Sequence, residues 1–312
     1  IEVAIEGSRE AISGGEQART FNASLSWNAG TSQGTAKTNI DLGTVESTSL
    51  LGGASDTWGG HTWTASDLAN FAVRIDSNTA TNGRDFSVDQ IQVKVYYTVD
   101  TTAPAGGSVT YANGYVTAAS VPVTYTLGTD SGAGLNNASG KIQRASASLS
   151  GGTCGTFGSF SDLVTEFDGS YTDTSVVNGN CYQYQYVISD NAGPTANTAT
   201  YTSANVVKVD TEIPSTVIDA ALGGGNPITN GTLTTATNIS FSFTPTDLVS
   251  GVAFSECKLD GGTYTLCTPA LVSYTGIADG THTVYVRSTD NAGNIESTAT
   301  LTWTIDTTAP VV

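Results

Sequence analysis

The sequence has no methionine, only two histidines and few basic residues, and these shortages exclude several classes of protein. Lys and Arg total 11 against 28 Asp and Glu, which gives a net charge of -17. Nucleic acids and anionic membranes are bound through basic patches, so neither is an expected partner. No apolar run approaches the ~18 residues that a membrane helix needs. Charged residues make up 12% of the chain, while Thr, Ser, Gly and Asn are abundant, a composition that favours strands and turns.

The small number of histidines also argues against catalysis. His282 lies in an alternating strand pattern, where a surface cross-strand role is expected, and His61 lies in a loop rich in Gly and Trp. No nucleophile-elbow motif accompanies them, and the cysteines lack the C-x2-C spacing of many zinc sites. The acidic residues fall mostly at predicted turns, so no carboxylate pair for glycoside hydrolysis is nominated. We therefore predict no catalytic residue and no enzyme activity.

Four cysteines form two groups, Cys154 with Cys181 and Cys257 with Cys267. Because each group falls in one predicted domain, we expect two disulfides within domains, and free structural thiols are the alternative. Disulfides would place the protein outside the cytosol. The chain starts at Ile1 without a signal peptide, so we expect a processed mature chain or a piece of a longer one.

An internal repeat sets the domain organisation. The phrase Asp-Thr-(Thr/Glu)-(Ala/Ile)-Pro follows a strand-like segment three times, and its copies begin at Asp100, Asp210 and Asp306. The first interval is 110 residues and the second 96, which suits Ig-sized sandwiches rather than short solenoid repeats. Proline cannot donate a sheet hydrogen bond, so each phrase marks a joint where one sheet ends and the next begins.

The predicted fold is all-β, with an N-terminal jelly-roll-like sandwich followed by two Ig-like domains. The domain bounds are 1–99, 100–209 and 210–306, and residues 307–312 are expected to begin a further linker or to form a strand-donating tail. In the third domain, short alternating segments are separated by turn signals every 8–12 residues, which is typical of a sandwich. In the first domain the strand signals lie at Ile1–Glu6, Phe71–Ile75 and Phe86–Tyr97.

Residues 100–312 resemble the bacterial Ig-like repeats of large secreted and cell-surface proteins. The resemblance rests above all on Glu256–Gly262, Cys267–Pro269 and Tyr274–Asn294. It implies secretion and a role as a stalk, spacer or adhesive array, and it implies a Cys257–Cys267 disulfide. Residues 50–98 resemble, more faintly, β-domains that accompany such repeats.

Repeated aspartates point to possible cation sites in both Ig-like domains. In an Ig-like sandwich, the loop after the second strand and the loop before the last strand lie at the same pole as the N-terminus. The linker aspartate of each domain should therefore meet two loop aspartates. The expected sets are Asp100 with Asp130 and Asp190, and Asp210 with Asp247 and Asp290. Clustered oxygens at a domain junction suit Ca²⁺, which would stiffen the joint. The alternative is that each aspartate only caps its own turn.

The sequence thus predicts a structural extracellular protein, a stalk or a subunit of a bacterial surface fibre. Its expected partners are other copies of itself or neighbouring surface proteins, and Ile1–Glu6 or Thr307–Val312 would complete the sheet edge of a neighbour. One alternative is an adhesin or carbohydrate-binding module in which Trp58, His61 and Trp63 contact a glycan, although such tryptophans more often fill cores. A second alternative is a phage virion decoration or tail-fibre protein.

Overall fold

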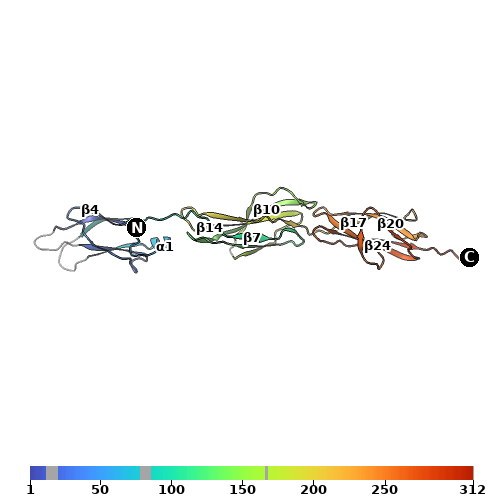
Figure 1. The fold of residues 1–312 in the computed structure, drawn as a ribbon, viewed down its shortest axis with the longest axis horizontal. Helices are drawn as coiled ribbons and strands as arrows, with labels where there is room; N and C mark the ends of the chain where they lie inside the picture. Colours follow the sequence, from blue (N-terminus) through green and yellow to red (C-terminus); the bar gives the residue numbers. More distant parts are fainter. Residues whose placement is uncertain (12–19, 78–85, 166–167, 312) are drawn as a thin grey trace. The chain divides into compact units, whose positions relative to one another are not determined.

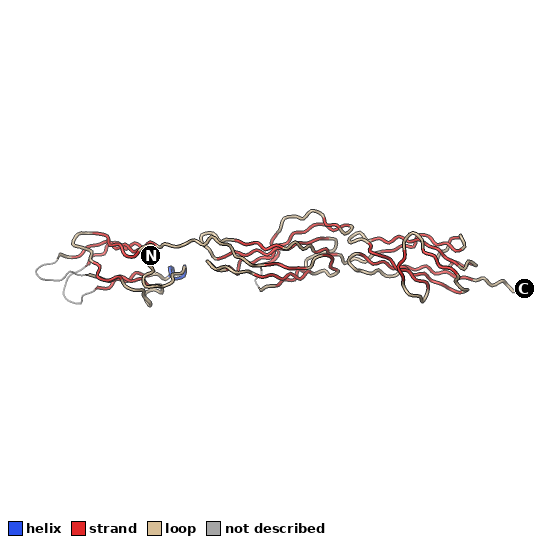
Figure 2. The backbone as a smooth tube through the Cα atoms, viewed as in Figure 1, coloured by secondary structure: helices blue, strands red, loops and turns tan. Residues whose placement is uncertain are grey.

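The computed structural model describes residues 1–11, 20–77, 86–165 and 168–311, and β-strands dominate their regular structure (Figures 1 and 2). The chain divides into two compact units, Ile1–Val99 and Asp100–Val312. The second unit contains two sandwiches, whose strands pair in separate sheets. The predicted all-β class with tandem sandwiches is confirmed. Val312, the last residue of the predicted tail, lies outside the described residues.

The first sandwich consists of two three-stranded sheets, with strand orders β4-β1-β6 and β3-β2-β5. Its strands are β1 (Glu2–Arg9), β2 (Phe21–Ser26), β3 (Lys37–Ile40), β4 (Ser47–Gly52), β5 (Ala72–Ser77) and β6 (Phe86–Lys94). These six described strands are fewer than the eight of a jelly roll. One short helix, α1 (Ala65–Ala69), was not predicted, and it begins with a capping box in which Thr64 and Asp67 exchange hydrogen bonds.

Strand β1 lies in the middle of its sheet and not at an edge. It pairs antiparallel with β4 on one side and with β6 on the other. Its alternating pattern places Val3 and Ile5 in the core, where both are fully buried. The prediction that Ile1–Glu6 completes the sheet of a neighbour is therefore wrong, because both edges of this strand are already paired within the chain.

The second sandwich packs two sheets around a core rich in tyrosine. One sheet has the order β11-β10-β14-β16-β8, with β12 also on β10 and β15 also on β14, and the other has the order β13-β9-β7. Tyr184 and Tyr186 alternate along β14 and are fully buried. The strands are β7 (Ser108–Tyr111), β8 (Gly114–Val116), β9 (Val121–Thr126), β10 (Leu135–Ser150), β11 (Thr153–Cys154), β12 (Ser161–Thr165), β13 (Ser170–Asp173), β14 (Asn180–Asp190), β15 (Thr198–Thr202) and β16 (Val207–Val209).

The third sandwich repeats this plan with the sheet orders β18-β17-β20-β23 and β19-β25-β24-β21-β22. Phe241, Phe243 and Trp303 lie in its core. In both Ig-like sandwiches a short strand pairs in parallel with the last strand, β8 with β16 and β19 with β25. The strands are β17 (Ser215–Gly223), β18 (Asn226–Pro227), β19 (Thr232–Thr234), β20 (Asn238–Thr246), β21 (Val252–Leu259), β22 (Thr265–Cys267), β23 (Val272–Thr275), β24 (Gly280–Asp290) and β25 (Ala299–Ile305).

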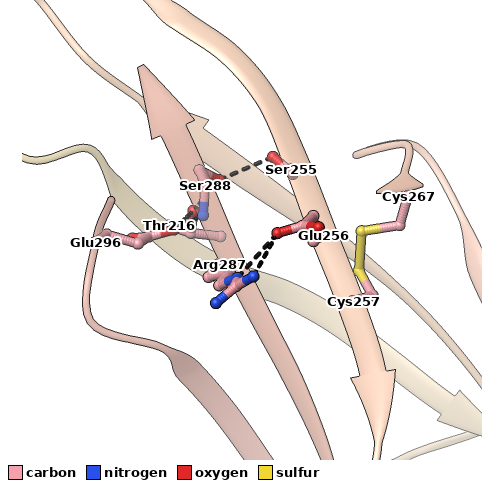
Figure 3. The surroundings of a disulfide bond; sticks show 8 residues. All are labelled: Thr216, Ser255, Glu256, Cys257, Cys267, Arg287, Ser288 and Glu296. Carbon is pink, nitrogen blue, oxygen red and sulfur yellow. Dashed lines mark hydrogen bonds and ion pairs between the residues drawn. A yellow bond between two sulfur atoms is a disulfide. The ribbon is translucent and has the colours of Figure 1, made fainter. Parts of the chain in front are cut away.

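Both predicted disulfides are present and no cysteine is free. Cys154–Cys181 joins β11 to β14, and Cys257–Cys267 staples β21 to the short strand β22 (Figure 3). Figure 3 also shows Glu256, the neighbour of Cys257, reaching the Arg287 guanidinium on β24, with 2.7 Å between Oε2 and Nη2. Each disulfide closes a loop within a single sandwich.

The second and third sandwiches are joined by backbone hydrogen bonds and an apolar contact. The amides of Gly151 and Gly152 donate to the carbonyl oxygens of Leu248 and Val249, at 3.0 and 2.9 Å. Val249 is buried in a cluster with Leu149 and Cys181. The Cys154–Cys181 disulfide thus belongs to the surface on which the third sandwich rests. Among the described residues, no helix is long and apolar enough to cross a lipid bilayer.

Candidate metal centres

The structure brings the six predicted aspartates together as two triads. The first triad consists of Asp100, Asp130 and Asp190, and the second of Asp210, Asp247 and Asp290. Within each triad, one carboxylate oxygen per residue lies within 4.8 Å of the other two. Each triad draws one aspartate from the segment before the first strand, one from the loop after the next long strand, and one from the end of β14 or β24.

Turn capping is also present, and it occupies mainly one oxygen of each loop aspartate. Oδ1 of Asp247 accepts hydrogen bonds from the amides of Val249, Ser250 and Gly251 at 2.7–3.1 Å. Oδ1 of Asp290 accepts from the three amides at positions 292–294 at 2.7–2.9 Å. The two alternatives from the sequence are therefore compatible, since a carboxylate can cap a turn with one oxygen and offer the other to a cation.

Asp210 is the aspartate whose environment calls for a further ligand. Its side chain is fully buried, and Oδ2 has no hydrogen-bond partner among the described residues. Burial, together with the carboxylates of Asp247 and Asp290, raises the pKa of Asp210 above its ordinary value. Two like charges 4.8 Å apart repel by about 1 kcal/mol even at the dielectric constant of water, and by more in a partly buried site. A bound cation would reverse that repulsion and satisfy the orphan oxygen.

Two asparagines that the sequence reasoning missed tie each triad to its linker. The Asn294 side-chain amide donates to Oδ2 of Asp290 at 2.8 Å and to the backbone carbonyl of Asp210 at 3.1 Å. Asn197 makes the same two bonds to Asp190 and Asp100, at 2.8 and 3.0 Å. Asn294 lies four residues after its aspartate but Asn197 lies seven after, because the second sandwich has three extra residues in this loop. That insertion hid the correspondence in the sequence.

The linker aspartate of the first triad approaches the backbone closely at Gly132. A Cβ atom on Gly132 would lie 2.3 Å from Oδ2 of Asp100, which is too close for any side chain. The same oxygen accepts a hydrogen bond from the amide of Ala133 at 2.7 Å. A side chain at position 132 would therefore displace the Asp100 carboxylate from its present position in the first triad.

The second triad lies against the end of the second sandwich. Burial and the carboxylates of Asp210, Asp290 and Asp247 together raise the pKa of Tyr115, a residue of β8. Lys208 of β16 donates to the carbonyl of Gly152 at 2.7 Å and lies over the Tyr115 ring. The second triad, Tyr115 and the Gly152–Val249 contact thus form one continuous joint.

The donor set of each triad suits Ca²⁺ better than a transition metal. All three side chains offer carboxylate oxygens, and Ca²⁺ takes six to eight oxygen ligands at about 2.3–2.6 Å. Two oxygens on opposite sides of such an ion are about 4.6–5.2 Å apart, so a spacing within 4.8 Å allows all three to bind one ion. Water and backbone carbonyls would complete the shell. Zinc and copper prefer nitrogen and sulfur ligands, which neither triad contains.

Of the predicted glycan-contact residues, Trp58 lies in the core, whereas His61 and Trp63 lie in a cluster of rings with Trp27. Trp58 is fully buried and its indole N–H donates to the carbonyl of Ile1 at 3.0 Å, so it offers no platform for a sugar. The Trp27 and His61 rings stack with centroids 3.8 Å apart, and Trp63 packs edge-on against both. His61 also lies 3.2 Å from Oδ2 of Asp67. These three rings form one partly exposed cluster, to which Trp58 does not belong.

His282 has a structural environment. Its Nδ1 lies 2.8 Å from Oδ2 of Asp260 and its Nε2 lies 2.9 Å from the carbonyl of Ala278. Burial acts to lower its pKa, but the two hydrogen-bond acceptors outweigh burial and raise the pKa of His282. The side chain thus links the loops at Asp260 and Ala278 at the start of β24.

Comparison with known proteins agrees with the architecture of the third sandwich. Residues 233–307 match the family model described as a bacterial Ig-like domain, whereas no curated protein sequence matches the chain. Among solved structures, the fibronectin(III)-like modules of Clostridium thermocellum CbhA are 14% identical, with a TM-score of 0.30, and the match covers 63% of this chain and 93% of that one.

A second similar structure is that of chicken CNTN1 domains FN1–FN3. It is 13% identical with a TM-score of 0.25, and the match covers 98% of this chain and 95% of that one. At these TM-scores neither structure supports an argument about this chain, so the assignment rests on the family model. The predicted resemblance is confirmed, since residues 233–307 match the model of a bacterial Ig-like domain.

Proposed function

We propose that this chain is a non-catalytic structural part of an extracellular bacterial surface protein, in which Ca²⁺ ions bound by the two aspartate triads stiffen the Ig-like sandwiches and their joint. The observation that carries the proposal is Asp210, a linker carboxylate that is fully buried beside two other carboxylates and has an orphan oxygen. Oδ1 of Asp210 accepts a hydrogen bond from the amide of Glu212 at 3.1 Å. Burying the other carboxylate oxygen without a partner is costly, and a divalent cation would supply the missing interaction.

The joint between the second and third sandwiches supports a load-transmitting role. It combines two backbone hydrogen bonds, the buried Val249 and the second triad, which come from separate segments of the chain. A cation at the triad would bind the linker residue Asp210 to Asp247 and Asp290, which belong to the third sandwich itself. The linker would then lose its freedom to swivel, as a stalk or fibre requires. The two disulfides favour an extracellular location.

Neither alternative role gains support from a particular contact. The adhesin interpretation named Trp58, His61 and Trp63 as glycan contacts, and of these Trp58 is fully buried while His61 stacks on Trp27. The stalk role is therefore the one we develop.

Calcium-dependent unfolding tests the proposal. The chain, stripped with a chelator, would be melted in chelator, in Ca²⁺ and in Mg²⁺, alongside the variants Asp210→Asn and Asp219→Asn. Asp219 is an exposed aspartate of β17 that hydrogen-bonds Thr244 and lies in neither triad. We expect Ca²⁺ to raise the melting temperature of the wild-type chain and of Asp219→Asn, and to raise that of Asp210→Asn less. Equal melting temperatures in Ca²⁺ and in chelator would reject a calcium-stiffened joint.

A further inference from the structure

Among the described residues, one edge of strand β6 in the first sandwich pairs with no other strand. It pairs with β1 on one side only, and among the described strands it is the longest to end a sheet, with nine residues. From Ser87 to Lys94 every residue is exposed. Such an edge presents a row of free N–H and C=O groups that can pair with another strand.

The face of β6 that belongs to the core is partly uncovered. Ile91 pairs with Ile5, and Val93 pairs with Val3. Directly paired residues point to the same side of a sheet, so Ile91 and Val93 face the core side. They are nevertheless 40% and 38% exposed, while Ile5 and Val3 are fully buried. An additional strand beside β6 would cover these two side chains.

The pairing with β1 shows which part of β6 is regular. A bulge interrupts the register between Glu6 and Gly7, and Asp89 is the extra residue. From Gln90 to Lys94 the register is unbroken, and the midpoint of this five-residue segment is Gln92. No proline interrupts it. This segment is therefore the part that can accept another strand in regular register.

The charges around this segment are self-complementary. Glu6, Glu46 and Asp89 form an acidic patch at the bulge end, where a hydrogen bond with Asp89, then repulsion from Asp89 and Glu6, raises the pKa of Glu46. Lys94 lies at the opposite end of the segment and points to the outer face, because it pairs with Glu2. If a second copy of this segment lies antiparallel to the first, its Lys94 lies beside the acidic patch of the first copy.

We propose that β6 pairs antiparallel with β6 of a second copy of this chain, about a two-fold axis that passes through Gln92. In this register Ile91 of each copy lies opposite Val93 of the other, on the core side. Gln90 lies opposite Lys94, whose ammonium group approaches the acidic patch, and Gln92 lies opposite itself. Two three-stranded sheets thereby become one six-stranded sheet, and Ile91 and Val93 of each copy are covered by the strand of the other copy.

Cysteine cross-linking in the full chain tests the register. All native cysteines are paired, so a new thiol is the only free one. Opposite Cα atoms of two antiparallel strands are about 5.5 Å apart in a hydrogen-bonded pair and about 4.5 Å apart in a non-hydrogen-bonded pair. Both distances are within the range of a disulfide. We expect Gln92→Cys to form a covalent dimer under mild oxidation. The matched control is Leu50→Cys, an exposed position on β4 at the other edge of the same sheet.

A charge reversal tests the partner chemistry. Sedimentation velocity of the chain with native cysteines should show a concentration-dependent dimer, and Lys94→Glu should weaken it by on the order of tenfold. Lys141→Glu, at an exposed lysine of the second sandwich that pairs with Asp162, should leave it unchanged. A wild-type chain that stays monomeric throughout overturns the proposal. Cross-linking of Leu50→Cys as fast as Gln92→Cys also overturns it, because that result indicates random collision.

Discussion

The side-chain amide of Asn294 donates a hydrogen bond to the backbone carbonyl of Asp210, at 3.1 Å, and so ties the loop after β24 to the segment that leads into the third sandwich. The residues are 84 positions apart in the sequence. Because the same amide also binds Oδ2 of Asp290, one asparagine links the carboxylate of Asp290 to the backbone of Asp210, two residues of the second triad. Several consequences of that arrangement can be measured.

Removing the asparagine should weaken one cation site and spare the other. Asn294→Ala deletes both hydrogen bonds, so Asp210 and Asp290 lose part of their orientation, and we expect the Ca²⁺ affinity of the second triad to fall by on the order of tenfold. Asn197→Ala is the matched variant, since Asn197 makes the equivalent bonds in the first triad. Calorimetric titration of both variants should show a different site weakened in each. Identical titration curves for the two variants and the wild-type chain would contradict the assignment.

Through Asp210, a fall in pH should stabilise the fold in chelator and should reduce its stabilisation by Ca²⁺. The pKa of Asp210 is raised in the folded chain by burial and by Asp247 and Asp290, so the folded state binds a proton more tightly than the unfolded state does. In chelator, the contribution of Asp210 to stability therefore increases as pH falls through its raised pKa, down to about pH 4, where the unfolded carboxyl also protonates. In Ca²⁺, protons compete with the ion and the stabilisation by calcium is lost over the same range.

The difference between the wild-type chain and Asp210→Asn, melted at a series of pH values, isolates this group from the other carboxylates. In chelator, Asp210→Asn should lack the gain in stability that Asp210 gives the wild-type chain on acidification. In Ca²⁺, the variant should lack the corresponding loss of stability. A wild-type chain whose difference from Asp210→Asn does not vary with pH would show that Asp210 is not the titrating group.

A methyl group at position 132 should eliminate the first triad. In Gly132→Ala the new Cβ would lie 2.3 Å from Oδ2 of Asp100, so the carboxylate must move away. We expect the chain to lose one of two bound Ca²⁺ ions while the second triad is unaffected. Gly158→Ala is the control, because the nearest heavy atom to its Cβ is 3.9 Å away. Unchanged calcium stoichiometry in Gly132→Ala would show that Asp100 is not a ligand.

The Cys154–Cys181 disulfide should support the joint as well as its own sandwich. Its loop spans 27 residues, for which chain entropy gives a stabilisation of about 3–4 kcal/mol. Because Cys181 also packs with Val249, replacing both cysteines by serine should speed hydrogen exchange of the Gly151 and Gly152 amides, which donate across the joint. The double serine variant of Cys257 and Cys267 should destabilise the third sandwich without that effect. If the two glycine amides are equally protected from exchange in both variants, the Cys154–Cys181 disulfide does not stabilise the joint.

Sequence reasoning reached the two triads because they depend on repeats. The linker phrase and the two loop phrases recur at comparable places in both Ig-like domains, and the topology of the sandwich then dictates that they meet. The disulfide grouping followed from the same domain bounds. Asn197 and Asn294 were both missed, because three extra residues in the second sandwich give them different spacings from their aspartates.

Other errors arose where a local pattern does not report tertiary partners. The alternation in Ile1–Glu6 shows that one face is buried, but it does not reveal whether one or two strands flank it, and β1 has two. Trp58 was named as a glycan contact only in an alternative, with core filling as the more usual role, and its indole lies in the core of the first sandwich. The five-residue helix α1 is too short for a periodic signal, and its capping box defines it instead.

Calcium titration of the metal-free wild-type chain beside Asp210→Asn tests the central claim most directly. The account predicts two bound Ca²⁺ ions in the wild-type chain and one in Asp210→Asn, with a smaller rise in melting temperature for the variant. If both proteins bind the same number of ions, or if neither releases or absorbs heat with Ca²⁺, the second triad is not a calcium site.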